Sequence, residues 1–276
     1  MKRILNICLA LGIIIALASC SPKNKNGAEA EKENMEAIQH SDSLPKLVKK
    51  LVKAVDRNDA KTFAELVAYP LERPYPLHDI ADATQMQNYY NILVDDSLRN
   101  LLLTSIPSDW NEYGWRGWSL ESGDCIWLDE DVVYNIPYLS AKETAMLDSL
   151  QKKEIASLAS GMRQGEWQPV TCFRTDDGRI FRIDLNRKPG KNAAYRLAEY
   201  ASPQQMRQMP GSIYTGYVDT EGSAMLSTYY FSNPSGAKAE YSPDSPDGQL
   251  TLTLTAPNTP SQTYLATPAC WLDLLP

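Results

Sequence analysis

The chain has 276 residues, with 34 Asp and Glu against 27 Lys and Arg, so its formal net charge is −7. An acidic chain repels nucleic acid and is not drawn to anionic lipid. The composition therefore excludes the classes of protein that bind nucleic acid or anionic lipid through charge. With 43% hydrophobic residues, a body of this length can bury a sizeable core as one large or two small domains.

The first segment has the pattern of a secretory signal. Lys2 and Arg3 precede an apolar run from Ile4 to Ala18, which is shorter than the roughly 20 residues that a membrane-spanning helix needs. The run stops at Cys20, and Leu-Ala-Ser-Cys at positions 17–20 resembles the lipobox of bacterial lipoproteins. This resemblance implies cleavage before Cys20, a diacylglycerol thioether on its sulfur and acylation of the new amine, a multi-chain anchor for the membrane. The alternatives are an uncut anchor or an ordinary signal peptide.

Residues 1–19 are therefore predicted as a signal peptide and residues 20–43 as a polar tether. The tether is rich in Lys, Asn, Glu and Ser and has too few large apolar residues to order itself. A short helix within it would stand alone. The tether contains lysines and lacks the acidic run that resembles a surface-export signal in some envelope lipoproteins. We therefore expect an outer-membrane protein that faces the periplasm.

Helices are predicted next. Apolar residues recur at helical spacing over 44–59, and Asp59 is placed to cap a second helix over 60–69. A proline-stiffened connection over 71–80 leads to a helix that we expect Thr84 to cap, and another opens at Asp95, Asp96 or Ser97.

From Trp110 the pattern changes to strands. Segments 111–120 and 125–131 predict two strands around a turn, and 132–139 can extend the sheet. Ser140 and Glu143 form a capping box for a long helix. A hairpin follows around Asp176-Asp177-Gly178, and in its second strand Arg182 and Asp184 alternate with apolar residues, which predicts one wet face.

The last third predicts a small antiparallel sheet or sandwich, because short strand patterns alternate with Gly, Pro, Asn and Ser. The fold class expected is α+β. Helices packed on a curved, cone-like antiparallel sheet would occupy residues 44–188, and a small β-rich antiparallel domain residues 193–276. Segments within 44–186, "FAELVAYPL" and "GDCIWLD" among them, resemble the nuclear-transport-factor-like (SnoaL-like) cone. The body also resembles an uncharacterised family of gut-bacterial envelope lipoproteins, which implies no activity.

Few residues offer chemistry. The chain has two histidines: His40 lies in the tether, and His78 with Asp79 forms a conceivable acid–base pair that is more typical of a loop and a turn. We therefore expect no cofactor, no metal and no catalytic residue. The acidic group at positions 124 and 129–131 lacks EF-hand spacing and is typical of solvated turns. Three cysteines remain in the processed body, which allows at most one disulfide, although small buried thiols fit their strand patterns better: Cys125, Cys172 and Cys270.

The candidate ligand-binding residues are aromatic. Trp115, Trp118 and Trp127 lie close together in the sequence, and Arg116 can hydrogen-bond a hydroxyl or carboxylate. Indoles provide platforms for sugar rings. In a regular strand Trp115 and Trp118 point to opposite faces, so they share a groove only if Gly117 makes a bulge, and core packing is the competing interpretation.

The function predicted is a lipid-anchored envelope protein that binds a glycan, a peptide or an envelope protein without chemistry of its own. One alternative is an isomerase-like or hydrolase-like enzyme with a cone-shaped apolar pocket, in which a lone carboxylate or phenol has a raised pKa. Another is a structural partner of an envelope complex. An exposed row of tryptophans would favour a glycan, and a deep pocket with a buried carboxylate would favour an enzyme.

Overall fold

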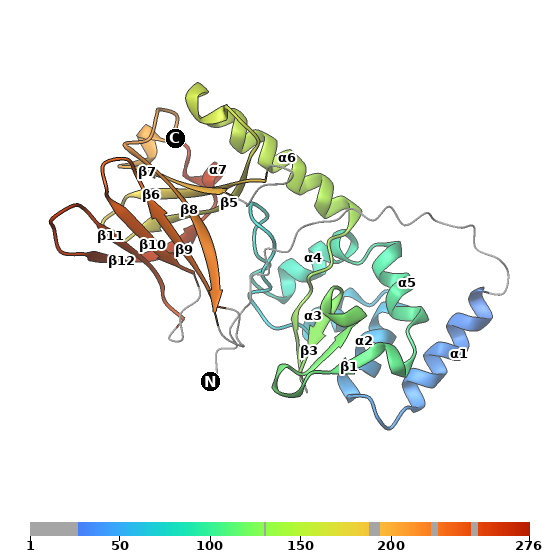
Figure 1. The fold of residues 1–276 in the computed structure, drawn as a ribbon. Helices are drawn as coiled ribbons and strands as arrows, with labels where there is room; N and C mark the ends of the chain where they lie inside the picture. The colour runs from blue at the N-terminus through green and yellow to red at the C-terminus, as the bar shows by residue number, and fades with distance from the viewer. Residues whose placement is uncertain (1–26, 130, 188–193, 222–225, 244–247) are drawn as a thin grey trace. The chain divides into compact units, whose positions relative to one another are not determined.

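The computed structural model of the protein describes residues 27–129, 131–187, 194–221, 226–243 and 248–276. These residues form two compact units that divide between Asp148 and Ser149, inside helix α6 (Ala141–Ser157) (Figure 1). We call residues 27–148 the helical unit and residues 149–276 the barrel unit. The predicted signal peptide and Cys20 lie outside the described residues.

The helical unit combines helices with a small antiparallel sheet. Strands β1 to β4 pair in sequence order, each with its neighbour in the chain. The helices are α1 (Gly27–His40), α2 (Lys46–Asp56), α3 (Ala60–Glu65), α4 (Ala83–Leu93) and α5 (Asp96–Thr104). The strands are β1 (Trp110–Glu112), β2 (Trp118–Leu120), β3 (Ile126–Leu128) and β4 (Val133–Asn135).

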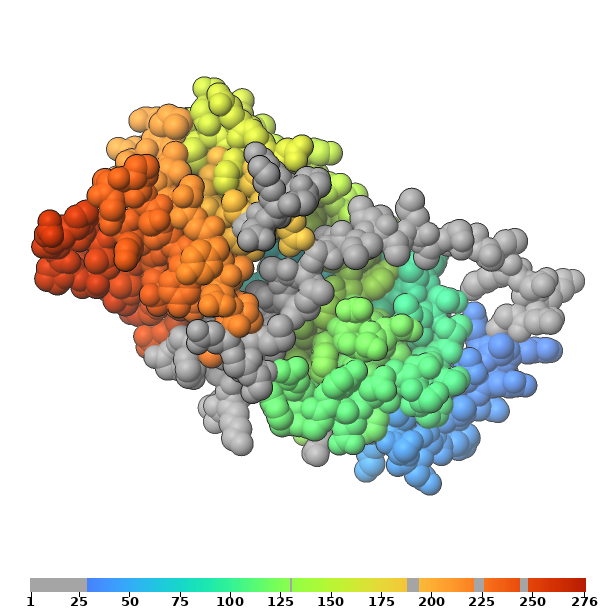
Figure 2. Space-filling view, in the orientation of Figure 1, coloured from blue at the N-terminus to red at the C-terminus, as the bar shows by residue number. Residues whose placement is uncertain are grey.

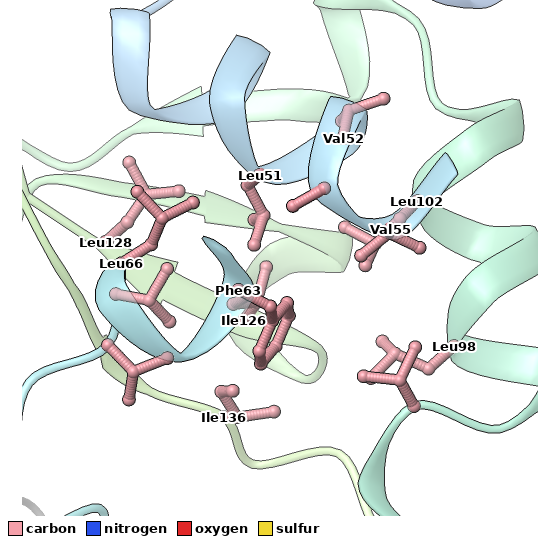
Figure 3. Packing of buried hydrophobic residues seen from close by; sticks show 14 of the residues in the cluster. Leu51, Val52, Val55, Phe63, Leu66, Leu98, Leu102, Ile126, Leu128 and Ile136 are labelled. Atoms are coloured by element: carbon pink, nitrogen blue, oxygen red, sulfur yellow. The ribbon is translucent and has the colours of Figure 1, made fainter. Parts of the chain in front are cut away.

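The core of the helical unit lies between these helices and the sheet, and Figure 3 shows its side chains converging from α2, α3, α5 and β3. The predicted periodicity of α2 is confirmed, because its apolar face is buried whereas Lys53 is exposed. Phe63 and Tyr90 meet edge to face with ring centroids 5.2 Å apart. Such burial is worth about 1.5–3 kcal/mol for each large side chain and is the main stabilising term of the unit.

Helix α1 departs from the expectation of a solvated tether over residues 20–43. Ile38 is fully buried, Met35 packs on the same core, and the Asn34 amide donates to the carbonyl of Thr104 over 2.9 Å. Met35 and Ile38 are three positions apart and so share one face of the helix. Two apolar residues on one face are enough to dock a helix that its polar composition alone would leave free.

The predicted helix caps are mostly confirmed. Asp59 accepts hydrogen bonds from the amide and hydroxyl of Thr62, and Asp95 caps α5. Ser140 and Glu143 form the expected reciprocal capping box. The prediction for α4 is wrong: Asp82 is the cap, and Thr84 is one of the two residues whose amides it accepts.

The barrel unit contains a closed up-and-down barrel (Figure 1). Among the described residues, eight antiparallel strands pair in sequence order, and the last pairs with the first: Ala266 lies opposite Thr175. The short helix α7 (Trp271–Leu274) follows. The strands are β5 (Trp167–Thr175), β6 (Ile180–Asn186), β7 (Ala194–Tyr200), β8 (Ser212–Glu221), β9 (Leu226–Ser232), β10 (Lys238–Ser242), β11 (Leu250–Thr255) and β12 (Gln262–Ala269).

Side chains from each of these eight strands fill the barrel. Phe173 of β5 stacks on Tyr241 of β10 at 4.2 Å between ring centroids, and Phe181 stacks on Phe173 at 5.5 Å. Because strand residues alternate, their neighbours face outward. On β8 and β9 these outward residues include the exposed Tyr217, paired with Tyr230. Figure 2 shows the barrel strands from β8 onward in orange to red.

The predicted wet face of strand β6 is wrong. Arg182 and Asp184 point outward, yet both are buried, and Arg182 bonds to Asp184 and to Glu154 of α6, each over 2.7 Å. The indole of Trp271 in α7 lies 5.0 Å from the Arg182 guanidinium. The charged side chains are therefore paired beneath covering helical segments, a partnership that alternation along one strand cannot reveal.

The α+β class with antiparallel sheets is confirmed. The hairpin of β5 and β6, expected with the helices in a domain spanning 44–188, pairs instead with β12 and β7 in the barrel. None of the helices within the described ranges combines the length and apolar composition needed to cross a bilayer.

Candidate functional site

One end of the barrel carries a cavity with a volume of about 540 Å³. The turns β5–β6, β7–β8, β9–β10 and β11–β12 meet at this end because the strands run alternately up and down. We call the cavity the mouth pocket. Its lining is Arg179, Glu199, Tyr214, Ala237, Lys238, Leu254, Thr255, Ala256, Thr259, Pro260, Gln262 and Tyr264.

Arg179 is the central charged group of the mouth pocket. It follows the turn Asp176-Asp177-Gly178, in which Gly178 has a φ of 91° and donates to the carbonyl of Thr175. A positive φ suits glycine, so the sequence closes the hairpin here and sets Arg179 at the rim. The prediction that these three residues form a hairpin turn is thus confirmed.

Two carboxylates and an aromatic ring fix the Arg179 guanidinium. It bonds to Asp177 over 2.8 Å and to Glu199 over 2.7 Å, and it lies 4.5 Å from the ring centroid of Tyr264. Burial opposes ionisation of Asp177, but hydrogen bonds from Arg179 and Thr175 outweigh it and lower the pKa of the carboxyl. Asp177 and Arg179 are therefore both charged at neutral pH, and their ion pair holds the guanidinium in place.

Neutral polar groups complete the lining. The Tyr264 hydroxyl donates to the Gln262 amide oxygen over 2.5 Å, and the Thr259 hydroxyl donates to the carbonyl of Ala256. Burial raises the pKa of Tyr214, so this phenol stays protonated as a donor. The pocket thus offers hydroxyl and amide groups beside tyrosine rings, with charges of both signs, which suits hydrogen bonding to a neutral polar molecule.

Buried carboxylates occur elsewhere in the two units, and arginines pair with each of them. Glu143 bonds to Arg73 over 2.8 Å in the helical unit. In the barrel unit Asp184 bridges Arg182 and Arg196, and Glu154 bonds to Arg182. Paired carboxylates of this kind hold the structure together, whereas the enzyme alternative requires a lone carboxylate whose pKa is raised.

Of the four candidate residues, Trp118 and Trp127 lie in strands of the β1–β4 sheet, and Trp115 and Arg116 lie in the turn between β1 and β2. Trp115 and Arg116 belong to a single 3₁₀ turn, Gly114–Arg116, where Trp115 is 73% exposed and the Arg116 guanidinium lies 5.2 Å from its ring centroid. Trp118 packs against the core. Trp127 donates from Nε1 to the carbonyl of Gly123 over 2.8 Å and packs 5.2 Å from the exposed Tyr113.

Gly117 lets this turn form, with a φ of 79°, and a Cβ there would lie 2.3 Å from the carbonyl oxygen of Leu128. Because Trp115 lies in this turn and not in a regular strand, the expectation that Trp115 and Trp118 point to opposite faces of one strand does not apply. The structure brings Tyr113 together with Trp127, and Trp115 together with Arg116. Among the described residues one indole, that of Trp115, is strongly exposed, and no row of exposed tryptophans is present.

The remaining sequence candidates lie in turns or in the core. Asp79 accepts a hydrogen bond from the amide of Arg73, and Asp129 accepts from the amides of Asp131 and Val132. All three body cysteines are free: Cys125 and Cys172 are buried and Cys270 is half-buried. Burial raises the pKa of Cys125 to about 12, so its thiol is inert at neutral pH.

The mouth pocket could not be recognised from the sequence because its residues come from separate hairpins. The one local signal is Arg179, directly after the Asp-Asp-Gly turn. Glu199 and Tyr264 join it only when the barrel closes.

Searches of protein-family models, of curated proteins and of solved structures found no match to this chain.

Proposed function

We propose that this chain is a lipid-anchored envelope protein that binds a small saccharide in the mouth pocket and performs no chemistry on it. The observation that carries the proposal is the fixed cluster of Arg179, Glu199 and Tyr264 in a cavity of about 540 Å³. A sugar presents hydroxyls that both donate and accept, beside apolar C–H faces. Ionised side chains and an amide match the hydroxyls, and tyrosine rings match the C–H faces.

The charge of the pocket supports a neutral ligand. Arg179 is held by two carboxylates, and Lys238 is the second basic residue of the lining. These two positive charges are balanced by Asp177 and Glu199, so neither an anion nor a cation gains from the local field.

A saccharide panel tests the proposal. The full chain is purified in a polyoxyethylene detergent, which carries neither sugar nor charge, and its thermal unfolding midpoint is measured with mono- and disaccharides, short peptides and common metabolites. We expect one class of saccharide to raise the midpoint, because a ligand that binds only the folded state stabilises it. Tyr264→Leu should abolish that rise. A flat response to every saccharide, or stabilisation by peptides alone, overturns the proposal.

Two matched variants locate the site. Tyr217→Leu removes an exposed tyrosine from the outer barrel wall and should leave saccharide binding unchanged. Trp115→Ala removes the exposed indole of the helical unit and should also leave it unchanged. If Trp115→Ala abolishes the response and Tyr264→Leu does not, the aromatic turn at 113–116 is the binding site and the mouth pocket is not.

The membrane anchor is part of the proposal and rests on the sequence at positions 17–20. Intact mass spectrometry of the native protein should show a chain that begins at Cys20 and carries acyl mass. Cys20→Ala should move the protein from the membrane fraction to the soluble fraction or leave the signal uncut. A native chain that begins elsewhere, or lacks acyl mass, overturns the anchor.

The cone-like interpretation of residues 44–188 also stays a proposal. Helices packed on the β1–β4 sheet support it in the helical unit. Hairpin β5–β6 gives it no support, because its partners are barrel strands.

A further inference from the structure

A second cavity, with a volume of about 350 Å³, lies in the barrel unit outside the barrel wall. The end of α6, the segment that follows it and strands β5–β7 supply its walls. We call it the arginine pocket. Its lining is Ile155, Leu158, Met162, Arg163, Gly165, Glu166, Trp167, Gln168, Arg187 and Arg196.

Arg196 is a buried charged residue in the wall of this pocket, with only 6% of its surface exposed. Its Nε donates to Asp184 over 2.8 Å and its Nη2 donates to the carbonyl of Met162 over 2.9 Å. Its guanidinium stacks on the indole of Trp167 at 4.5 Å. Its Nη1 has no hydrogen-bond partner among the residues that the structure describes. A buried guanidinium that is fixed on two sides thus retains one donor group for a ligand.

Two further arginines line the same cavity. Arg163 and Arg187 are exposed, and Arg163 uses only its Nε, which donates to the carbonyl of Leu158 over 2.7 Å. Glu166 is the one acidic residue of the lining. The lining therefore carries a net charge of +2, or +1 when the buried ion-pair partners Asp184, Arg182 and Glu154 are counted with it, on a chain whose net charge is −7. Such a local excess attracts anions against the field of the whole protein.

The remaining wall is apolar. Ile155, Leu158 and Met162 line one part of the cavity, beside the indole of Trp167. Gly165 has a φ of 91°, and a Cβ there would lie 3.2 Å from Nε1 of Trp167, so the backbone passes close to the indole. The pocket thus combines donors for an anionic head with an apolar surface for a small hydrocarbon group.

We propose that the arginine pocket is a second binding site, for a small organic anion that has a carboxylate or phosphate head and an apolar body. Arg196 and the two exposed arginines hold the head, and the Trp167 side of the cavity holds the body. This ligand class differs from the neutral saccharide proposed for the mouth pocket, and the two sites share no lining residue.

Calorimetric titration of the full chain in the same uncharged detergent tests the proposal. The probes are phenyl phosphate, benzoate, inorganic phosphate and neutral benzyl alcohol. We expect the two aromatic anions to bind and benzyl alcohol not to bind. Affinity should fall as salt increases, because the recognition is between charges at the protein surface. If inorganic phosphate binds as tightly as phenyl phosphate, the cavity does not recognise an apolar body, and that part of the proposal is overturned. If benzyl alcohol binds as tightly as the anions, the cavity does not recognise an anionic head, and that part is overturned.

The variant Arg163→Gln/Arg187→Gln keeps the buried Arg196 and its partners intact, so it should fold. Losing two charged hydrogen bonds should weaken phenyl phosphate by at least about ten-fold. Arg207→Gln, which removes an exposed arginine outside the lining, is the matched control and should bind normally. Unchanged affinity in the double variant, or an equal loss in the control, overturns the site.

Cross-tests separate the two proposals. The double arginine variant should keep any saccharide response, and Tyr264→Leu should keep phenyl phosphate binding. If no saccharide binds, the anion titration still tests the arginine pocket, because the titration uses different probes and different variants from the saccharide panel.

Discussion

Single glycines position Trp115, whose side chain is strongly exposed. Gly114 and Gly117 enclose the turn that carries Trp115, and their φ angles are 59° and 79°. Their surroundings differ: a Cβ on Gly114 would have nothing within 4 Å, whereas one on Gly117 would meet the carbonyl oxygen of Leu128 at 2.3 Å. Gly117 also has a ψ of −141°, outside the left-handed helical region, so an alanine there meets more backbone strain as well as a collision.

We predict that Gly117→Ala destabilises the helical unit clearly more than Gly114→Ala. A positive φ costs an alanine about 1–2 kcal/mol, and Gly117→Ala must in addition adopt a ψ of −141° and push strands β2 and β3 apart. Urea unfolding followed by tryptophan fluorescence measures both variants. Equal losses would show that contact with Leu128 does not matter to the fold.

At the residue scale, some candidates could be recognised from the sequence and others could not. The Asp-Asp-Gly turn that places Arg179 is a local signal and was predictable. The burial of Arg182 was not, because its partner Glu154 is 28 positions away and its indole cover is the still more distant Trp271. A charged residue on an alternating strand looks solvated until its counter-charge is known.

At the element scale, helix caps show how far short-range patterns determine the structure. The Ser140–Glu143 box was predictable because its two hydrogen bonds join residues three positions apart. At α4, both Asp82 and Thr84 are good cap residues, and the chain uses the earlier one. Local preference names the cap only to within a couple of residues when two candidates are close.

Asp95 is an N-cap that does more than begin helix α5. Its carboxylate accepts from the amides of Ser97 and Leu98, from the Tyr138 hydroxyl over 2.6 Å and from the amide of Ala141. Burial opposes its ionisation, but these hydrogen bonds outweigh burial and lower the pKa of Asp95. The ionised carboxylate thus joins α5 to the start of α6.

We predict that Asp95→Asn destabilises the protein at neutral pH and that this difference from the wild type shrinks in acid. A lowered folded-state pKa stabilises the fold above the unfolded pKa of about 3.9, and that contribution is lost as the pH falls through the folded value. Asparagine still caps a helix, so the change reports mainly on charge. Urea midpoints measured from neutral pH down to about pH 2 follow it. A difference that stays constant over this range contradicts the prediction, and Asp96→Asn, in the same turn and exposed, is the control.

At the scale of the whole molecule, closure of the barrel decides where the candidate sites lie. Most strands between residues 167 and 269 could be predicted from the turn residues that separate them. The pairing of β12 with β5, in contrast, joins residues about 90 positions apart. No local pattern encodes that register, so the sequence analysis assigned β5 and β6 to the helical part. The mouth pocket depends on this closure, because Gln262 and Tyr264 come from the strand that completes it.

The described residues contain two buried hydrophobic clusters that share no member, one in each unit. Phe63 is fully buried in the first, and Phe173 is fully buried in the second. A matched pair of truncations can therefore weaken one core at a time. Chains with separate cores often depart from two-state unfolding.

We predict that Phe63→Ala and Phe173→Ala each lower stability by about 3–5 kcal/mol, and that each does so in its own unit. Hydrogen exchange read by mass spectrometry should show Phe63→Ala speeding exchange in α2 and α5 while β6 and β7 keep their protection. Phe173→Ala should give the reverse, because it removes the ring that stacks between Phe181 and Tyr241. If either variant speeds exchange equally across both units, the chain unfolds as one cooperative body, and the two clusters act as a single core.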